Sequence, residues 1–313
     1  MNAAAGLVTY SAAVLAFGPS VLGRLSRAGH APRVGVAAWV GAVASVLMAW
    51  LAAAILLVIS VAAHWGRHNS LVRCCVEVLC RWAAGDAGRY AQLGVLTGVG
   101  VVLAGIGYLV VRGGRTVVRL RGRARAHAQA VRLVGHPTDV PDVYVVDAPE
   151  RTAYCVAGRP STIVVTSAAV AVLDRHELAA VIAHERAHVA GHHPAVMTML
   201  RGVATVFARV RLMNRAVTEV SRLLEMCADD AAARRHGRCA LVGGLMALVA
   251  AVPAGALGAA DVAVLSRAQR LLSPATPGGR VSAQIGLTAA ATAFLLTPAS
   301  LVVLDIAGLL PCI

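Results

Sequence analysis

Four long stretches of the chain carry apolar residues without a charged one: residues 1–23, 34–63, 90–111 and 281–304. At about 1.5 Å of rise per residue, a helix of each length can cross roughly 30 Å of hydrocarbon. The pattern predicts a mainly α-helical membrane protein with four transmembrane helices. No basic residue precedes the first apolar run, since Arg24 is the first arginine, and this favours a transmembrane helix over a cleaved signal peptide.

The charges between these stretches predict the orientation. Residues 112–132 contain seven arginines and no acidic residue, which places this segment in the cytoplasm by the positive-inside rule. The loop 64–89 mixes arginines with acidic residues and is then outside, as are both termini. This loop holds Cys74, Cys75 and Cys80, for which an oxidising exterior permits a disulfide, although the sequence fixes no pairing.

The predicted organisation has three parts. Residues 1–111 hold three transmembrane helices and the outer loop, residues 112–280 form a cytoplasmic domain, and residues 281–313 hold the fourth helix and the C-terminus. Residues 239–260 are also free of charge, but glycines and Pro253 interrupt them. We therefore expect residues 239–251 to form a buried or membrane-apposed helix.

Composition narrows the class further. The chain is 58% hydrophobic and 14% charged, with a mean hydropathy of +0.72, values that exclude an ordinary soluble globular protein. High apolar content and the lack of a glycine period exclude disordered and fibrous classes. All 29 basic residues are arginine and the net charge is +14. A lysine-free, Ala/Val/Arg-rich chain is typical of a GC-rich bacterial genome, so we expect a bacterial inner membrane.

The cytoplasmic segment combines short strands with helices. Short β-branched runs at residues 143–146, 154–156 and 162–166 are separated by Asp, Pro and Gly, and they predict a small antiparallel sheet. A helix then begins after Asp174, whose pairing with Glu177 is typical of a capping box, and ends near Gly191.

That helix carries the motif His184-Glu185-Arg186-Ala187-His188. Two histidines four residues apart lie on one helix face, where both imidazoles can bind one zinc ion. Glu185 is then placed to act as general base on the attacking water. The spacing predicts peptide hydrolysis, although a helix with two solvated histidines can match the motif by chance.

The identity and position of the third zinc ligand distinguish the protease families that use this motif. A third histidine six residues after the second is excluded, because that position is Pro194. Downstream, Glu225 lies on a second predicted helix and could complete a His-His-Glu site, and Asp229, one turn on, could orient a histidine. Two helices that supply three ligands leave an open coordination position, as a catalytic site requires.

Other residues near the motif have simpler interpretations. Glu225 could instead pair with Arg222 on a solvated helix face, and Asp230 is expected to form such a pair. Cys227 points away from the face of Glu225 and is expected to be buried. Three further histidines are expected to support the site or lie on the surface rather than bind the metal: His192, His193 and His236.

Together, the His-Glu-x-x-His helix and Glu225-Met226-Cys227-Ala228-Asp229 resemble the signature of membrane gluzincins. Two related families share it, the HtpX/Ste24-like proteases and the BlaR/MecR-type metallopeptidases, and the four-span layout is more similar to the BlaR/MecR type. The resemblance implies an α+β zincin-type domain with one zinc ion per chain. It assigns zinc to His184, His188 and Glu225, the base to Glu185 and support to Asp229. It also implies an edge for an extended substrate at Thr162, Ile163, Val164, Val165 and Thr166.

One feature of the BlaR/MecR type is missing. The chain has no lysine, so it cannot carry the Ser-x-x-Lys motif of a penicillin-binding sensor. A stimulus would have to come through a separate sensor partner, the outer loop or the bilayer. The resemblance implies a cytoplasmic protein substrate, with a DNA-binding repressor as the candidate, and no direct binding of nucleic acid by this chain.

Four other functions remain open from the sequence. An HtpX-like quality-control protease would use the same residues. An intramembrane protease would take Asp305 as third ligand, but the motif helix is short and has polar flanks. A non-enzymatic receptor or scaffold would not need the complete set of site residues. A transporter is disfavoured, because no inverted repeat is visible.

Overall fold

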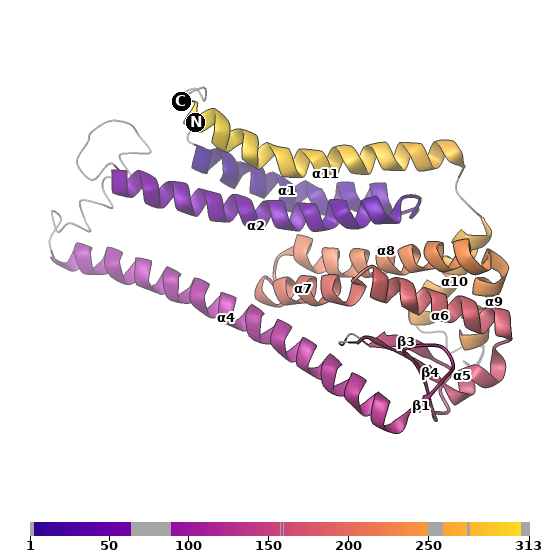
Figure 1. Ribbon diagram of the computed structural model, residues 1–313. Helices are drawn as coiled ribbons and strands as arrows, with labels where there is room; N and C mark the ends of the chain where they lie inside the picture. Colours follow the sequence, from indigo (N-terminus) through magenta and orange to yellow (C-terminus); the bar gives the residue numbers. More distant parts are fainter. Residues whose placement is uncertain are drawn as a thin grey trace.

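The computed structural model describes residues 3–63, 89–156, 158, 160–249, 259–273 and 276–307. Helices make up most of the described chain, and four short strands form one sheet (Figure 1). The three cysteines of the predicted outer loop lie outside the described residues. The fold is thus mainly helical, as expected.

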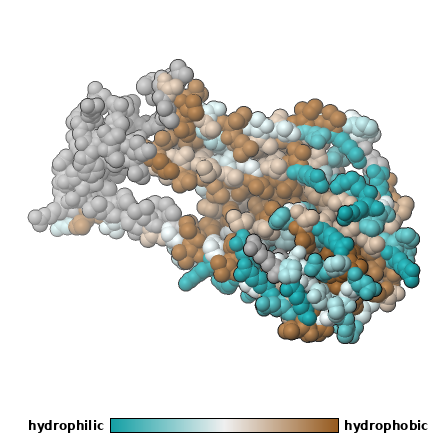
Figure 2. Space-filling view, in the orientation of Figure 1, coloured by the Kyte–Doolittle hydropathy of each residue, from teal (hydrophilic) through white to brown (hydrophobic). Residues whose placement is uncertain are grey.

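Three described helices are long and apolar enough to cross a membrane: α1 (Ala3–Ser26), α2 (Pro32–Ala63) and α11 (Pro277–Ile306). They coincide with the first, second and fourth predicted spans and pack side by side (Figure 1). Large apolar side chains such as Phe17 and Leu295 are more than half exposed on this bundle, and Figure 2 shows a hydrophobic surface over it. Such a surface is suited to lipid, so the chain is a multi-pass membrane protein.

The predicted third span lies in α4 (Arg89–Val134), one continuous helix of 46 residues. Many side chains of residues 90–111 lie outside the described part, and this span stays a prediction. The second half of α4 carries the arginine run, with Arg112 through Arg125 exposed. Because the helix is continuous, the predicted domain boundary at residue 112 falls inside it.

The sheet is mixed rather than antiparallel. Its strands are β1 (His136–Pro137), β2 (Val143–Val146), β3 (Ala153–Val156) and β4 (Thr162–Thr166), in the order β1-β2-β4-β3. β2 and β4 run parallel, whereas β1–β2 and β3–β4 are antiparallel. The three predicted runs are confirmed as strands, and the prediction of a purely antiparallel sheet is wrong because β4 enters between β2 and β3.

This order also corrects the predicted substrate edge. The predicted edge residues form β4: Ile163, Val164 and Val165 pair with both β2 and β3, Thr162 pairs with β3 and Thr166 with β2, and all five are buried. A β-branched strand buried on both faces is stabilised most in the middle of a sheet, where both sets of backbone groups are paired. The outer strands are β1 and β3, and the edge next to α6 belongs to β3.

Six helices follow the sheet: α5 (Ser167–Val172), α6 (Arg175–Ala190), α7 (His193–Val206), α8 (Arg211–His236), α9 (Arg238–Val249) and α10 (Ala259–Leu272). The capping box at the start of α6 is confirmed, since Asp174 accepts from the backbone N–H of Glu177 and Glu177 accepts from that of Asp174. α9 packs against α6 and α10 with Leu241 and Leu245 buried, which confirms the buried helix expected at residues 239–251.

The largest hydrophobic cluster joins the spans to the helices that follow the sheet. Trp39 of α2 and Leu22 of α1 are fully buried in the same cluster as Leu212 and Leu223 of α8. A hydrogen bond also connects α8 to α1, since the Arg222 guanidinium donates to the carbonyl of Ser26 at 2.9 Å. α8 is therefore fixed against the transmembrane bundle, and it carries part of the candidate site.

Candidate metal centre

The centre starts on α6, where His184 and His188 lie one turn apart and are both buried. The helical spacing brings their Nε2 atoms within 3.1 Å of each other. The capping box fixes the start of this helix, so the two rings are held on a well-anchored element. Both face α8, the helix that packs most extensively against α6.

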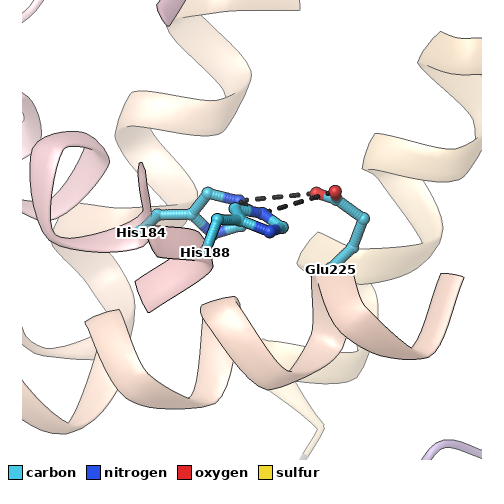
Figure 3. Close-up of side chains that lie close together, drawn as sticks. All are labelled: His184, His188 and Glu225. Carbon is cyan, nitrogen blue, oxygen red and sulfur yellow. Dashed lines mark hydrogen bonds and ion pairs between the residues drawn. The ribbon is translucent and has the colours of Figure 1, made fainter. Parts of the chain in front are cut away.

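Glu225 meets the two rings from α8 (Figure 3). One carboxylate oxygen lies 3.4 Å from Nε2 of His184, and the other lies 3.4 Å from Nε2 of His188. Its side chain is 37% exposed, whereas the rings are nearly enclosed. The solvated alternative, a pair between Glu225 and Arg222, is not formed, because Arg222 pairs with Glu219 at 3.0 Å.

These three side chains fit a zinc ion. One ligand atom from each lies within 4.8 Å of the others, in a group that the described residues supply from two helices. Two imidazoles and one carboxylate are a donor set that zinc prefers at catalytic sites, with a further position left open. His184, His188 and Glu225 are therefore the zinc-binding group of this chain.

Asp229 supports His184 from behind. Its Oδ1 lies 3.1 Å from Nδ1 of His184, a buried atom that forms no well-aligned hydrogen bond within the described residues. Asp229 itself is fully buried. A carboxylate at Nδ1 selects the tautomer that leaves Nε2 free for a metal.

Arg267 of α10 holds both acidic residues of the centre. Its guanidinium donates to Asp229 through Nε at 2.8 Å, and Nη1 lies 3.0 Å from Glu225. Burial raises the pKa of Glu225, but His184, His188 and Arg267 outweigh it and hold that pKa well below its usual range. Burial likewise opposes ionisation of Asp229, yet Arg267 and His184 keep its pKa low. Both carboxylates are thus ionised.

His193 supports the second histidine. Its Nδ1 lies 2.8 Å from Nδ1 of His188, and the two rings meet edge to face. Burial, followed by the nearby His188, lowers the pKa of His193 to about 4, so this ring is neutral at neutral pH. The ring occupies Nδ1 of His188 as Asp229 occupies Nδ1 of His184, and both Nε2 atoms are left for the metal.

Glu185 faces the free edge of the sheet. It contacts Cys155 of β3, whose backbone N–H favours the ionised carboxylate, while burial raises the pKa of Glu185. Burial and Glu185 together raise the pKa of the Cys155 thiol to about 12, so that thiol is neutral. A buried carboxylate with a raised pKa next to a metal site is typical of a general base.

Comparison with known proteins agrees with this geometry. The sequence model of peptidase family M48 matches residues 121–269, just under half of the chain, and the match includes all three zinc-binding residues. The chain is a zinc metallopeptidase, and its matched segment is similar to family M48. No solved structure matched the chain. Of the two families that the signature resembles, the M48 match corresponds to the HtpX/Ste24-like proteases.

Two contributors to the peptidase centre were missed by sequence reasoning. Arg267 lies 38 residues beyond Asp229 on a separate helix, and no spacing rule connects them. Cys155 lies on a strand whose position in the sheet was not predicted. His193 was expected to support the site or lie on the surface, and it contacts His188.

The remaining candidates of the peptidase segment lie apart from the metal. His192 and His236 are exposed, and His192, which directly precedes α7, has a positive φ of 54°. Cys227 is buried, as expected, and Asp230 pairs with Arg270 at 2.8 Å. The side chain of Asp305, the ligand of the intramembrane alternative, lies outside the described part.

Proposed function

We propose that this chain is a membrane-embedded zinc endopeptidase that cleaves protein segments at the cytoplasmic membrane surface. The convergence of His184, His188 and Glu225 next to Glu185 carries the proposal, because it combines a three-residue zinc site with a base whose pKa is raised by burial. A scaffold without activity would not need Asp229 and Arg267 to orient these ligands.

Glu185 performs the proton transfers in this proposal. Zinc, when bound, supplies a Lewis acid that polarises the scissile carbonyl and makes water more acidic. The Glu185 carboxylate takes a proton from the attacking water and gives it to the leaving amine. The contact with Cys155 keeps the carboxylate in place between the metal ligands and the sheet.

The free edge of β3 aligns the substrate. Thr166 donates from its backbone N–H to the carbonyl of Thr152, so residues 152, 154 and 156 face β4. The backbone groups of Ala153 and the carbonyl of Cys155 therefore point to the free edge, where the Cys155 N–H donates to Glu185. An extended peptide that pairs with this edge passes beside Glu185, and this arrangement restricts cleavage to unfolded or flexible segments.

The sidedness of the site follows from the arginines. The exposed run on α4 and the basic residues at the junction of α1 and α2 are expected on the same face of the membrane protein. By the positive-inside rule this face is cytoplasmic, as is the peptidase segment, and both termini are outside. A bacterial inner membrane remains the expected location.

The family match favours a role in membrane-protein quality control over a signalling role. An HtpX-like protease degrades many damaged membrane proteins, whereas a BlaR/MecR-like one makes a defined cut in one cytoplasmic regulator, such as a DNA-binding repressor. A separate sensor partner would be needed only for the second. Substrate breadth distinguishes them: cells with Glu185→Gln accumulate many membrane proteins in the first case and a single regulator in the second.

The test of activity compares three forms of the full chain, purified in detergent with zinc. An unfolded casein serves as substrate. Glu185→Gln should lower the cleavage rate by roughly 10²- to 10⁴-fold while zinc content stays unchanged. Glu150→Gln removes the same charge at an exposed position and should cleave as the wild type does. Equal rates for Glu185→Gln and the wild type would refute the assignment of the base.

A further inference from the structure

A cavity of about 950 Å³ lies where the ends of the spans at the α1–α2 junction meet α8 and α10. Its wall includes the junction between α1 and α2, the end of α8, the last turns of α10 and the start of α11. Five arginines and one acidic residue contribute to the lining: Arg33, Arg234, Arg238, Arg270, Arg280 and Asp230. The cavity shares α8 and α10 with the metal centre, but none of the three zinc-binding residues lines it.

The charges of this cavity are not balanced within the described chain. Asp230 forms an ion pair with Arg270, which donates to both of its carboxylate oxygens at 2.8 and 2.9 Å. Among the described residues, no acidic group lies within ion-pair distance of the other four arginines. The N-termini of α2 and α11 open on the same space and add positive potential. The site therefore favours an anion.

The wall of the cavity is preformed. Arg270 Nε donates to the carbonyl of Gly29 at 3.1 Å, in the short connection between α1 and α2. Gly29 has a φ of 63°, and a side chain there would collide with Met226 of α8. This close approach locks the connection onto α8 and α10, so the arginines surround a defined space instead of a flexible loop.

A shallow apolar groove continues from the cavity along α11. Gln284 lines both, and the groove then follows small and apolar residues on the lipid-facing side of the span: Ile285, Thr288, Ala289, Thr292, Ala293 and Leu296. A basic cavity at the end of a span, continuous with an apolar groove along it, matches a molecule with an anionic head and a hydrocarbon tail. A soluble anion would occupy only the basic cavity and not the apolar groove.

We propose that this cavity binds the phosphate-bearing headgroup of an anionic membrane lipid, one acyl chain of which lies in the groove along α11. Guanidinium groups bind phosphate oxygens through paired, charge-assisted hydrogen bonds, and the cavity offers several at the depth of the headgroups. The six arginines of α4 between residues 112 and 125 are exposed, are not among the residues that line this cavity, and serve as a topology signal.

Binding is measured on the full chain in neutral detergent, without reference to peptidase activity. The probe is phosphatidylglycerol with a fluorescent acyl chain; unlabelled phosphatidylcholine with the same chains and inorganic phosphate are the competitors. Phosphatidylglycerol should bind saturably, and neither competitor should displace it at equal concentration. Arg238→Gln with Arg280→Gln should weaken binding about 30-fold, since each arginine near a lipid phosphate contributes about a factor of five.

Two controls separate this site from general attraction to charge. Arg121→Gln with Arg123→Gln removes two exposed arginines of α4 and should leave the affinity unchanged. Ala293→Trp fills the groove and should weaken lipid binding while the cavity arginines remain. Unchanged zinc content and thermal unfolding show that each variant is folded.

Three results would overturn the proposal. The first is equal affinity for phosphatidylglycerol and phosphatidylcholine. The second is equal weakening by the cavity and the α4 variants, which would reduce the effect to net charge. The third is inorganic phosphate binding as tightly as the lipid, with no effect of Ala293→Trp, which would make the occupant a soluble anion.

Discussion

Two neighbouring ion pairs connect α8 to α10, and they differ mainly in how far their side chains are buried. Asp229 pairs with Arg267 in the metal centre, and Asp230 pairs with Arg270 in the arginine cavity. The residues are adjacent on α8 and one turn apart on α10. Yet the Asp229 side chain is fully buried, whereas that of Asp230 is 33% exposed. The same pair of residue types therefore acts in two different environments.

The burial of each ion pair determines its role. At the buried pair the carboxylate has a second neighbour, His184, so its geometry sets the direction of a zinc ligand. At the half-exposed pair water screens the charges, and Asp230 serves to hold Arg270 in the cavity wall. If this comparison is right, neutralising the two aspartates must have very different consequences.

The most direct consequence for zinc binding is expected from Asp229→Asn. The amide cannot hold the His184 tautomer as a carboxylate does, and it leaves Arg267 with Glu225 as its remaining acidic partner. Loss of such a supporting group lowers metal affinity by about 10- to 100-fold. Competition with a zinc chelator measures the change. An affinity within twofold of the wild type would contradict the role of Asp229.

Arg267→Met tests the same pair from the other side. Methionine fills the space of the arginine stem but leaves the carboxylate of Asp229 buried without its cation. Breaking a buried pair in this way costs roughly 3–5 kcal/mol, measured as the change in free energy of unfolding in detergent. The double variant with Asp229→Asn should lose less than the sum of both single losses. Strict additivity would show that the two residues are not coupled.

Proton release on zinc binding is the next effect. Burial lowers the pKa of His184, but Asp229 and Glu225 raise it more, to about 9 in the metal-free protein. His184 is then protonated at pH 7 and must lose that proton to bind zinc. Zinc affinity should fall by about tenfold per pH unit below pH 9 and level off above it. Calorimetry between pH 6.5 and 9.5 checks this, and an affinity independent of pH would contradict it.

The smallest effect is expected from Asp230→Asn. A half-exposed ion pair contributes about 1 kcal/mol or less, so the free energy of unfolding should hardly change. Zinc affinity should be that of the wild type, because Asp230 does not contact the metal ligands. A loss of zinc as large as that of Asp229→Asn would remove the distinction between the two pairs.

The zinc-binding residues were predictable because helical spacing is a local property. His184 and His188 follow from a four-residue interval, and Glu225 and Asp229 from the same interval on a second helix. The helices α1, α2 and α11 were equally predictable as spans, because the thickness of the bilayer sets a minimum length for an apolar helix that crosses it.

Features that depend on distant contacts were not predictable in this way. The central place of β4 depends on which strand enters between its neighbours, and three strand-like runs do not determine that order. Arg267 reaches the centre only because α10 folds back against α8. The shared core of α8 with the spans, as at Trp39 and Leu223, reflects packing that a separate cytoplasmic domain does not predict.

Zinc content per chain tests the central claim most directly. The wild type, Glu225→Ala and the control Glu219→Ala on the same helix are purified in detergent and analysed for metal. One zinc ion is expected in the wild type and the control, and close to none in Glu225→Ala. A wild type without zinc, or zinc unaffected by the loss of Glu225, would contradict the assignment of His184, His188 and Glu225 as the metal centre.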